Sequence, residues 1–301
     1  MAAFPGRVAV NELLSATSAH QGVTVAGWVR TKRESKDFAF VEVNDGSCLA
    51  NLQVIVDGRT AGYEHLGEVG TGAAIAAQGD LVESPGKGQR WELRAASLRV
   101  VGHCDEDYPL QKKRHSDEFL RSIAHLRART NKYGALARLR SRLSFATHQF
   151  FQRRGFHYVH TPIITGSDCE GAGEMFRVTT LDPYQAGARV HDDDFFGKEA
   201  HLTVSGQLSV ETYCLALSKV YTFGPTFRAE NSNTSRHMAE FWMIEPEIAF
   251  ADIHDDMQLA EDMVRELVAF AREDCAQDLE LFAKFVDPAL YARLDQVMQS
   301  E

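Results

Sequence analysis

The sequence lacks the features that define several common classes of protein. No apolar run approaches the length of about 20 residues that a membrane-spanning helix needs. The amino-terminal segment has no basic region followed by an apolar stretch, so we expect no secretion signal and a cytoplasmic protein. Five scattered cysteines without paired spacing argue against a disulfide framework and against a zinc site. There is no internal repeat. These absences leave a globular protein, and 301 residues allow one large or two ordinary domains.

Positive charge is in the minority, with 32 Lys and Arg against 42 Asp and Glu, and this balance ordinarily argues against a nucleic-acid partner. The distribution reverses that inference. Residues 111–142 hold ten Lys or Arg against two acids, and Arg30, Lys32, Arg33 and Lys36 form a second basic cluster. Residues 251–301 hold thirteen acids against four basic residues. The asymmetry fits a basic face for a polyanion, although a single charge run is more often only a solvated face.

The first hundred residues predict five short strands after a short helix at 10–16. Apolar and polar residues alternate at 23–30, 38–43, 52–56, 73–80 and 91–101, and turn signals such as Asn44-Asp45-Gly46 separate the runs. Five strands in about 80 residues predict an OB-fold β-barrel, an architecture that binds oligonucleotides.

A basic, aromatic strand face in this barrel fits single-stranded RNA, which proteins bind by stacking bases on rings and contacting the backbone with cations. Phe40 is the candidate stacking platform, and Arg33 and Gln53 are the candidate base readers. Arg30 and Lys32 are candidate backbone contacts. The alternative is that the strand's aromatic residues are core residues, and we expect one of Phe38 and Phe40 to be deeply buried and the other to lie near the rim.

The rest of the chain predicts a linker and a second domain. Residues 106–132 form a basic linker with little apolar periodicity, and apolar residues at helical spacing predict a helix at 135–151. An apolar stripe predicts another helix at 257–270, and 282–298 reads as a helical pair split by Pro288. We therefore predict an α+β chain with domains at 1–105 and 133–301, joined by the linker.

Residues 221–250 predict a β-hairpin with an unusual set of polar side chains. Arg228 and Glu230 precede a polar loop, and Phe241 follows it. Arginine holds phosphate or carboxylate in a forked geometry, glutamate accepts from an amine or hydroxyl, and phenylalanine offers a flat face to a base. Glu245 and Glu247 alternate with apolar residues, so both acids should point away from the apolar side. From spacing alone, a half-buried hairpin with solvated charges is equally open.

The segments F-R-A-E and R-H-M-A-E-F-W-M-I-E-P-E in this hairpin resemble motif 2 of the class II aminoacyl-tRNA synthetases, in the form found in asparaginyl-tRNA synthetases. The resemblance implies that Arg228 holds the ATP α-phosphate and the amino-acid carboxylate. It places Glu230, His237 and Phe241 in the ATP site and Glu245 at the α-amino group.

Two further segments resemble the same family. S-D-C-E-G-A-G-E-M-F resembles the flipping loop over the amino acid, and implies that Glu170 contacts the α-amino group. V-S-G-Q-L-S-V-E implies that Ser205 and Gln207 also bind the amino acid. The aspartyl relatives carry a Lys three residues after this Gln, whereas this chain has Val210 and then Glu211. A neutral residue beside an acid rejects a carboxylate, and Glu211 can accept from a carboxamide, so asparagine is favoured over aspartate.

Two segments nearer the amino terminus also resemble this family. R-G-F-x-x-V-x-T-P resembles class II motif 1, which implies a homodimer through this helix and strand. G-W-V-R-x-K-R with F-x-F-V-E-V-N-D-G-S resembles the anticodon-binding barrel of the aspartyl, asparaginyl and lysyl synthetases, in which a Phe, an Arg and a Gln at the positions of Phe40, Arg33 and Gln53 bind the central U. The linker touches tRNA in that family. The implied partners are tRNA(Asn), L-asparagine and ATP.

Class II motif 3, a glycine-rich segment with an ATP-binding Arg and nearby Mg²⁺ ligands, has no counterpart here. Gly224 is the last glycine, and the final 77 residues contain none. We expect a fragment or a truncated product that stops within the catalytic domain, with an unpaired sheet edge, and Mg²⁺ ligands in the missing part. The resemblance implies an asparagine–tRNA ligase. A tRNA-binding module without chemistry, and an aspartyl-type or ammonia-using asparagine-forming relative, are the alternatives.

Overall fold

The computed structural model describes residues 4–86, 88–169, 171, 173–182, 184, 191–232, 234 and 237–300. The chain divides into two compact units. Unit 1 is Met1–Ser141 with Arg272–Arg293, and unit 2 is Arg142–Ala271 with Leu294–Glu301. The division falls inside helices α4 (Asn131–Arg153) and α6 (Ile253–Asp274), so each of these helices contributes residues to both units.

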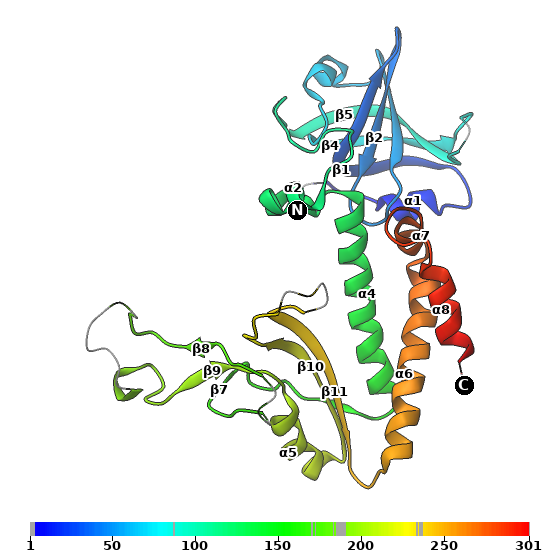
Figure 1. The fold of residues 1–301 in the computed structure, drawn as a ribbon. Coiled ribbons are helices and arrows are strands. Elements are labelled where there is room, and N and C mark those ends of the chain that lie inside the picture. Colours follow the sequence, from blue (N-terminus) through cyan, green and yellow to red (C-terminus); the bar gives the residue numbers. More distant parts are fainter. Residues whose placement is uncertain are drawn as a thin grey trace. The chain divides into compact units, whose positions relative to one another are not determined.

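Unit 1 is built on a closed barrel with the strand order β1-β2-β3-β5-β4 (Figure 1), which confirms the predicted five-stranded barrel. Neighbouring strands are antiparallel except for β3 and β5, which are parallel. The elements are α1 (Val10–Leu14), β1 (His20–Glu34), β2 (Phe38–Asn44), β3 (Leu52–Asp57), η1 (Tyr63–Glu68), β4 (Ala74–Glu83), β5 (Trp91–Gly102), α2 (Asp117–Ser122), α3 (Ala124–Arg127) and α7 (Ala276–Phe285), with part of α8 (Leu290–Gln299).

The barrel core follows from strict alternation along its strands. On β2 the residues Ala39, Val41 and Val43 are fully buried, and β3 buries Leu52, Val54 and Val56 in the same way. Because successive strand residues point to opposite faces, the side chains between them lie on the outside of the barrel. This places Phe38 and Phe40 together on the outer face, both half-buried. The expectation that one of these two rings is deeply buried is therefore wrong.

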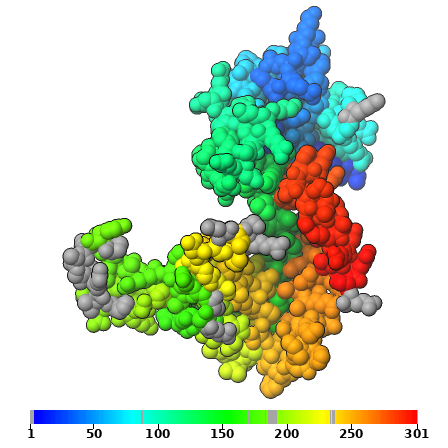
Figure 2. All heavy atoms as spheres, in the orientation of Figure 1, coloured from blue at the N-terminus to red at the C-terminus, as the bar shows by residue number. Residues whose placement is uncertain are grey.

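The segment predicted as a linker contains two short helices that periodicity did not reveal. Ser116 caps the start of helix α2, and its hydroxyl accepts from the Phe119 backbone N–H at 3.2 Å. This is a local capping interaction, and a six-residue helix is too short to show an apolar repeat. Most side chains of residues 111–129 are exposed, and they lie on the surface of unit 1 (Figure 2).

Unit 2 is centred on a hairpin, formed by β10 (Lys219–Phe227) and β11 (Glu240–Ile248) in antiparallel register. Strand β6 (His157–Tyr158) adds to β10 in parallel, and β7 (Ile164–Thr165), β9 (Ala200–Leu202) and β8 (Arg177–Val178) form a second small sheet. The described part of unit 2 also contains η2 (His191–Asp193) and α5 (Gln207–Leu217). The predicted hairpin is confirmed, and so is the helical pair around Pro288, as α7 and α8.

One face of the hairpin packs on helices. Phe150 and Phe151 of α4 and Tyr221 of β10 are fully buried, and Ile244 of β11 and Met263 of α6 pack against them. Tyr221 stacks on Phe151 with ring centroids 4.4 Å apart. Since this face is occupied by aromatic and aliphatic side chains, the polar residues of the hairpin are presented on the other face.

None of the described helices is both long enough and apolar enough to cross a membrane.

Candidate functional site

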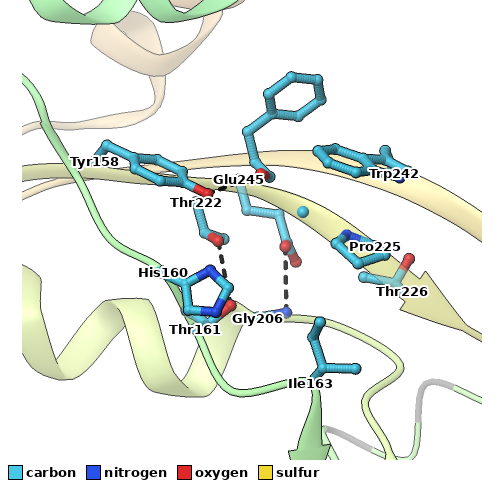
Figure 3. A pocket seen from close by; sticks show the side chains of 12 residues that line it. Tyr158, His160, Thr161, Ile163, Gly206, Thr222, Pro225, Thr226, Trp242 and Glu245 are labelled. Atoms are coloured by element: carbon cyan, nitrogen blue, oxygen red, sulfur yellow. Dashed lines mark hydrogen bonds between the residues drawn. The ribbon is translucent and has the colours of Figure 1, made fainter. Parts of the chain in front are cut away.

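Glu245 is the centre of the polar face of the hairpin. It lies opposite Thr222 in the strand register and is only 7% exposed. Its carboxylate accepts from the Gly206 backbone N–H at 3.2 Å and from the Ser205 hydroxyl. Figure 3 shows Glu245 reaching from β11 towards Gly206, with Thr161 and Thr222 beside them. A buried carboxylate with two donors still has free lone pairs, so it can accept from an ammonium group.

Gly206 has to be a glycine in this arrangement. A Cβ at this position would lie 2.6 Å from the Thr161 hydroxyl oxygen, 2.9 Å from Thr222 Cγ2 and 3.3 Å from Glu245 Oε2. Distances below 3.0 Å force neighbouring groups to move. The absence of a side chain therefore lets the backbone N–H approach Glu245.

A second group of polar side chains surrounds Gln207, the first residue of α5. The Gln207 side-chain amide donates to Glu211 Oε1 at 3.0 Å and to Glu247 Oε1, and the Gln207 backbone N–H donates to Ser205 Oγ at 3.1 Å. The structure thus brings together all four described residues that the sequence predicted for the amino acid: Ser205, Gln207, Glu211 and Glu245. It adds Glu247, which the sequence analysis placed on the correct strand face without a role.

Val210 does not enter this cluster. It is fully buried and packs with Val159, Cys214 and Val220 in a small core under α5. The position therefore supplies packing, while the charge that meets the polar face comes from Glu211, one residue further along the helix.

The residues predicted for ATP are only partly brought together. The Arg228 guanidinium carbon lies 5.4 Å from the centre of the Phe241 ring, and the Arg228 backbone N–H donates to Ala239 O at 3.1 Å. Among the described residues, Arg228 Nε is buried without a hydrogen-bond partner. Glu230 and His237 are exposed, and His237 pairs with Thr234 in the loop, so no contact of the described residues joins His237 to Arg228.

The segment that resembles the flipping loop lies against these ATP residues. The Ala229 backbone N–H donates to Glu174 O at 2.7 Å. A Cβ at Gly173 would lie 3.3 Å from Arg228 Cδ and 2.5 Å from Glu230 Oε1. The backbone of this segment is therefore in close contact with the Arg228 and Glu230 side chains. Glu170, which was predicted to contact the α-amino group, lies outside the described residues.

The barrel brings its three predicted RNA-binding residues to one outer face. Arg33 lies opposite Phe40 in the β1–β2 register, and its guanidinium carbon is 5.7 Å from the centre of the Phe40 ring. Gln53 on β3 lies opposite Glu42, two residues along from Phe40. Diagonal neighbours on one sheet face are about 7–8 Å apart, so the three side chains form one surface.

The two cations predicted to contact the RNA backbone are used inside the protein. Arg30 donates to Arg129 O and, at 2.6 Å, to Asn131 Oδ1, and burial lowers the pKa of its guanidinium. Lys32 Nζ donates to Leu66 O at 2.9 Å and lies 2.7 Å from Glu34. These contacts do not support the prediction that Arg30 and Lys32 bind the RNA backbone. The sequence could not reveal this, because composition does not distinguish a solvated cation from one that binds the chain's own carbonyl groups.

Glu92 is a further residue of the candidate RNA-binding face, because it contacts Gln53, and the sequence analysis missed it. Only 2% of it is exposed, and its Oε2 accepts from Gln53 Nε2 at 3.3 Å and from Ser84 Oγ at 2.8 Å. Among the described residues its Oε1 has no hydrogen-bond partner, and Arg94 Nε stands off at 4.0 Å. A charged residue between Trp91 and Leu93 in a strand was the available signal, because an acid in an apolar run needs a partner.

The described residues contain no group of three or more His, Cys, Asp or Glu side chains that could hold a metal ion.

A closed five-stranded barrel and a motif-bearing hairpin with an acidic face define the class of protein. The family of class II tRNA synthetases (D, K and N) matches residues 116–299, and the OB-fold nucleic acid binding domain matches residues 23–101. The chain belongs to the class II tRNA synthetases of this D, K and N group.

Within this family, the chain is similar to individual asparagine–tRNA ligases. The asparagine–tRNA ligase of Nitratidesulfovibrio vulgaris strain DP4 is 62% identical over 296 residues, which are 97% of this chain and 64% of the relative. The enzyme of the same name from Geobacter sulfurreducens is 57% identical over 298 residues. The crystal structure of asparaginyl-tRNA synthetase from Pyrococcus horikoshii complexed with asparaginyl-adenylate matches with a TM-score of 0.82 and 25% identity, covering 99% of this chain and 64% of that one. The chain thus spans just under two thirds of the length of these relatives.

Proposed function

We propose that the chain serves asparagine–tRNA ligation, the ATP-dependent activation of L-asparagine and its transfer to tRNA(Asn). The observation that carries the proposal is the acidic cluster of Ser205, Gln207, Glu211, Glu245 and Glu247 on one face of the hairpin. Three of its five members, Glu211, Glu245 and Glu247, carry carboxylates, which accept hydrogen bonds. The names of the relatives, asparagine–tRNA ligases, agree with this chemistry.

Asparagine offers two groups that donate hydrogen bonds, and the cluster offers acceptors for both. Glu245, aided by Gln207, is assigned to the α-ammonium, and Glu211 to the carboxamide NH₂. Aspartate would present a carboxylate to Glu211 instead. A buried acceptor left without its donor costs about 1–3 kcal/mol. Two like charges facing each other in a partly buried site add to this cost, so the site should discriminate strongly against aspartate.

Activation begins when an oxygen of the asparagine carboxylate attacks the α-phosphorus of ATP in line. The bond from that phosphorus to the bridging oxygen breaks, and pyrophosphate leaves with the electron pair. Arg228 is assigned to hold both the carboxylate and the α-phosphate, and Phe241 and Glu230 to hold the adenine, with His237 nearby. Positioning and charge stabilisation supply the acceleration, so no general base is required at this step.

Transfer follows when a ribose hydroxyl at the 3′ end of tRNA(Asn) attacks the carbonyl carbon of the adenylate and AMP leaves. We assign recognition of this tRNA to the outer barrel face of Arg33, Phe40 and Gln53. Phe40 provides a ring for a splayed anticodon base, and the polar neighbours read its edge.

A homodimer acting in the cytoplasm is part of the proposal. The segment that resembles motif 1 exposes Phe145 by 51% and Tyr158 by 41%, and apolar side chains of this kind on a helix and an adjacent strand suit a self-complementary interface. Light scattering during size-exclusion chromatography gives the mass directly, and a monomer at micromolar concentration would contradict this part.

The deciding experiment is asparagine-dependent exchange of radiolabelled pyrophosphate into ATP, with aspartate as the competing amino acid. Any exchange should depend on asparagine and not on aspartate, while the missing motif 3 favours a binding module for the 301-residue chain itself. Stimulation by aspartate would overturn the side-chain assignment. If no exchange occurs but tRNA(Asn) is retarded in a salt-sensitive gel assay, the chain is instead a tRNA-binding module.

A further inference from the structure

Arg138 of α4 connects three segments of unit 1 that are far apart in the sequence. Its Nε and Nη2 donate to the two carboxylate oxygens of Asp278 on α7, at 3.0 and 2.6 Å, and its Nη1 reaches Gly46 O at 3.4 Å. The Arg138 and Asp278 side chains are 23% and 9% exposed. A forked contact of this kind fixes orientation as well as distance.

Gly46 belongs to the turn between β2 and β3, the strands that carry Phe40 and Gln53. The turn is rigid. Asp45 accepts from the Val10 and Ser47 backbone N–H groups, both at 3.0 Å, and its neighbour Asn44 donates to Ala50 O at 2.9 Å. Because these hydrogen bonds tie the turn to its surroundings, the contact of Arg138 with Gly46 O at 3.4 Å also links α4 to the two strands.

The start of α4 is held at a second point of the barrel. Arg30 on β1 donates to Arg129 O and to the side chain of Asn131, the first residue of α4. The Arg129 guanidinium carbon lies 5.7 Å from the Trp28 ring centre and 5.8 Å from that of Tyr108. Two separate attachments, at Asn131 and at Arg138, prevent this end of α4 from pivoting about either one.

We propose that Arg138 is a positioning residue for tRNA recognition, which holds the base-reading face of the barrel in a fixed geometry with the basic segment 111–142. The proposal rests on the function proposed above. If a whole tRNA contacts both surfaces, its affinity depends on their relative placement, whereas an anticodon hairpin reaches only the barrel face. Replacing Arg138 leaves Asp278 as a buried charge without this partner, and α7 loses its ion pair with α4.

The test compares two RNAs, a tRNA(Asn) transcript and its isolated anticodon stem-loop, binding to the 301-residue chain at one salt concentration. The variants are Arg138→Met and Arg138→Lys. Lysine keeps a cation beside Asp278 but cannot make the forked contact and reach Gly46 O as well. The control is Arg293→Met, which removes an exposed arginine paired with Asp287 in the same unit.

We expect Arg138→Met to weaken binding of the whole tRNA about tenfold, the change that ~1.4 kcal/mol produces, and to leave stem-loop binding within about twofold. Arg138→Lys should fall between it and the wild type, whereas a lysine variant equal to the wild type would overturn the inference by showing that Arg138 acts only through its charge; the control should match the wild type. Equal weakening of both RNAs, or of neither, overturns the inference. If Arg138→Met gives no cooperative melt, the ratio for Arg138→Lys decides. Failure of the wild-type chain to bind either RNA would overturn the proposed function itself.

Discussion

In the barrel, Gln53 donates to Glu92 across two hydrogen-bonded strands, whereas in unit 2 Gln207 donates from helix α5 to Glu247 on strand β11. The same amide-to-carboxylate contact is thus built in two ways. In the barrel the register of a closed ladder brings the pair together. In unit 2 a helix start has to approach a strand, and Gly206 permits the approach.

The two regions should respond differently when a side chain is replaced. A side chain on the outer barrel face can change without altering the ladder, so its replacement should affect RNA binding and leave the fold intact. The polar groups of unit 2 hold one another through Ser205, Gly206 and Gln207, so replacing one of them should disturb the rest.

Glu245→Gln should show the largest effect. Replacing this buried carboxylate removes the negative charge assigned to the α-ammonium, and charge-assisted hydrogen bonds contribute about 1.5–3 kcal/mol, so asparagine affinity should fall roughly 10- to 100-fold. Calorimetric titration with asparagine measures it. Glu240→Gln, at the exposed start of the same strand, is the control. Unchanged affinity in Glu245→Gln would remove Glu245 from the site.

Phe40→Ala tests whether the barrel behaves differently. Stacking contributes about 1–3 kcal/mol per base, so binding of the anticodon stem-loop should weaken by about tenfold, with an unchanged melting temperature. Phe38→Ala is the matched variant, because its ring lies 5.0 Å from that of Phe40 on the same face. If the Phe38 variant weakens binding more than the Phe40 variant, the platform is Phe38. A large loss of stability in both would contradict the distinction between the two regions.

Arg30→Met and Arg33→Met should separate structural from RNA-binding cations within the barrel. Loss of the Arg30 contacts to Arg129 O and Asn131 should lower the free energy of unfolding by about 1–3 kcal/mol, without changing the salt dependence of RNA binding. Arg33→Met should weaken stem-loop binding several-fold with little change in stability. Urea denaturation and binding at several salt concentrations measure the two effects. A weaker salt dependence in Arg30→Met would restore Arg30 as an RNA contact.

The sequence predicted most where structure is local or periodic. Alternation located the five strands and the outward direction of Glu245 and Glu247, and Pro288 marked the break between α7 and α8. The motif resemblance pointed to Ser205, Gln207, Glu211 and Glu245, which the structure brings together. It did not reveal that Arg30 and Lys32 bind backbone carbonyl groups or that Arg138 meets Asp278, because those partners are 34 to 140 residues away. Such pairs depend on tertiary packing, which no local pattern encodes.

The smallest expected effect concerns a surface pair in η1 of unit 1. His65 Nδ1 lies 2.9 Å from Glu68 Oε1, and this hydrogen bond and charge raise the pKa of His65 and lower the pKa of Glu68. His103 at 3.5 Å from Glu68, and Glu64 at 3.9 Å from His65, are the other charged groups. The unit 2 cluster has no such exposed histidine pair among its described residues, so this pH response belongs to the barrel.

The two pKa shifts determine how the stability of the fold changes with pH. The raised pKa of His65 stabilises the fold fully below its unfolded value of about 6.5, and the contribution is lost as pH rises through the higher folded value. The lowered pKa of Glu68 contributes above about 4.3 and is lost as pH falls through the lower folded value. The two shifts describe one pair, which is fully charged only between these two values, so the melting temperature of the wild type should exceed that of Glu68→Gln most near pH ~5.5, and the difference should shrink as pH rises through the folded pKa of His65 towards ~8.5. Nuclear magnetic resonance should show the pKa of His65 falling in the variant. A difference in melting temperature that is the same at both pH values would show that Glu68 acts by packing and not by charge.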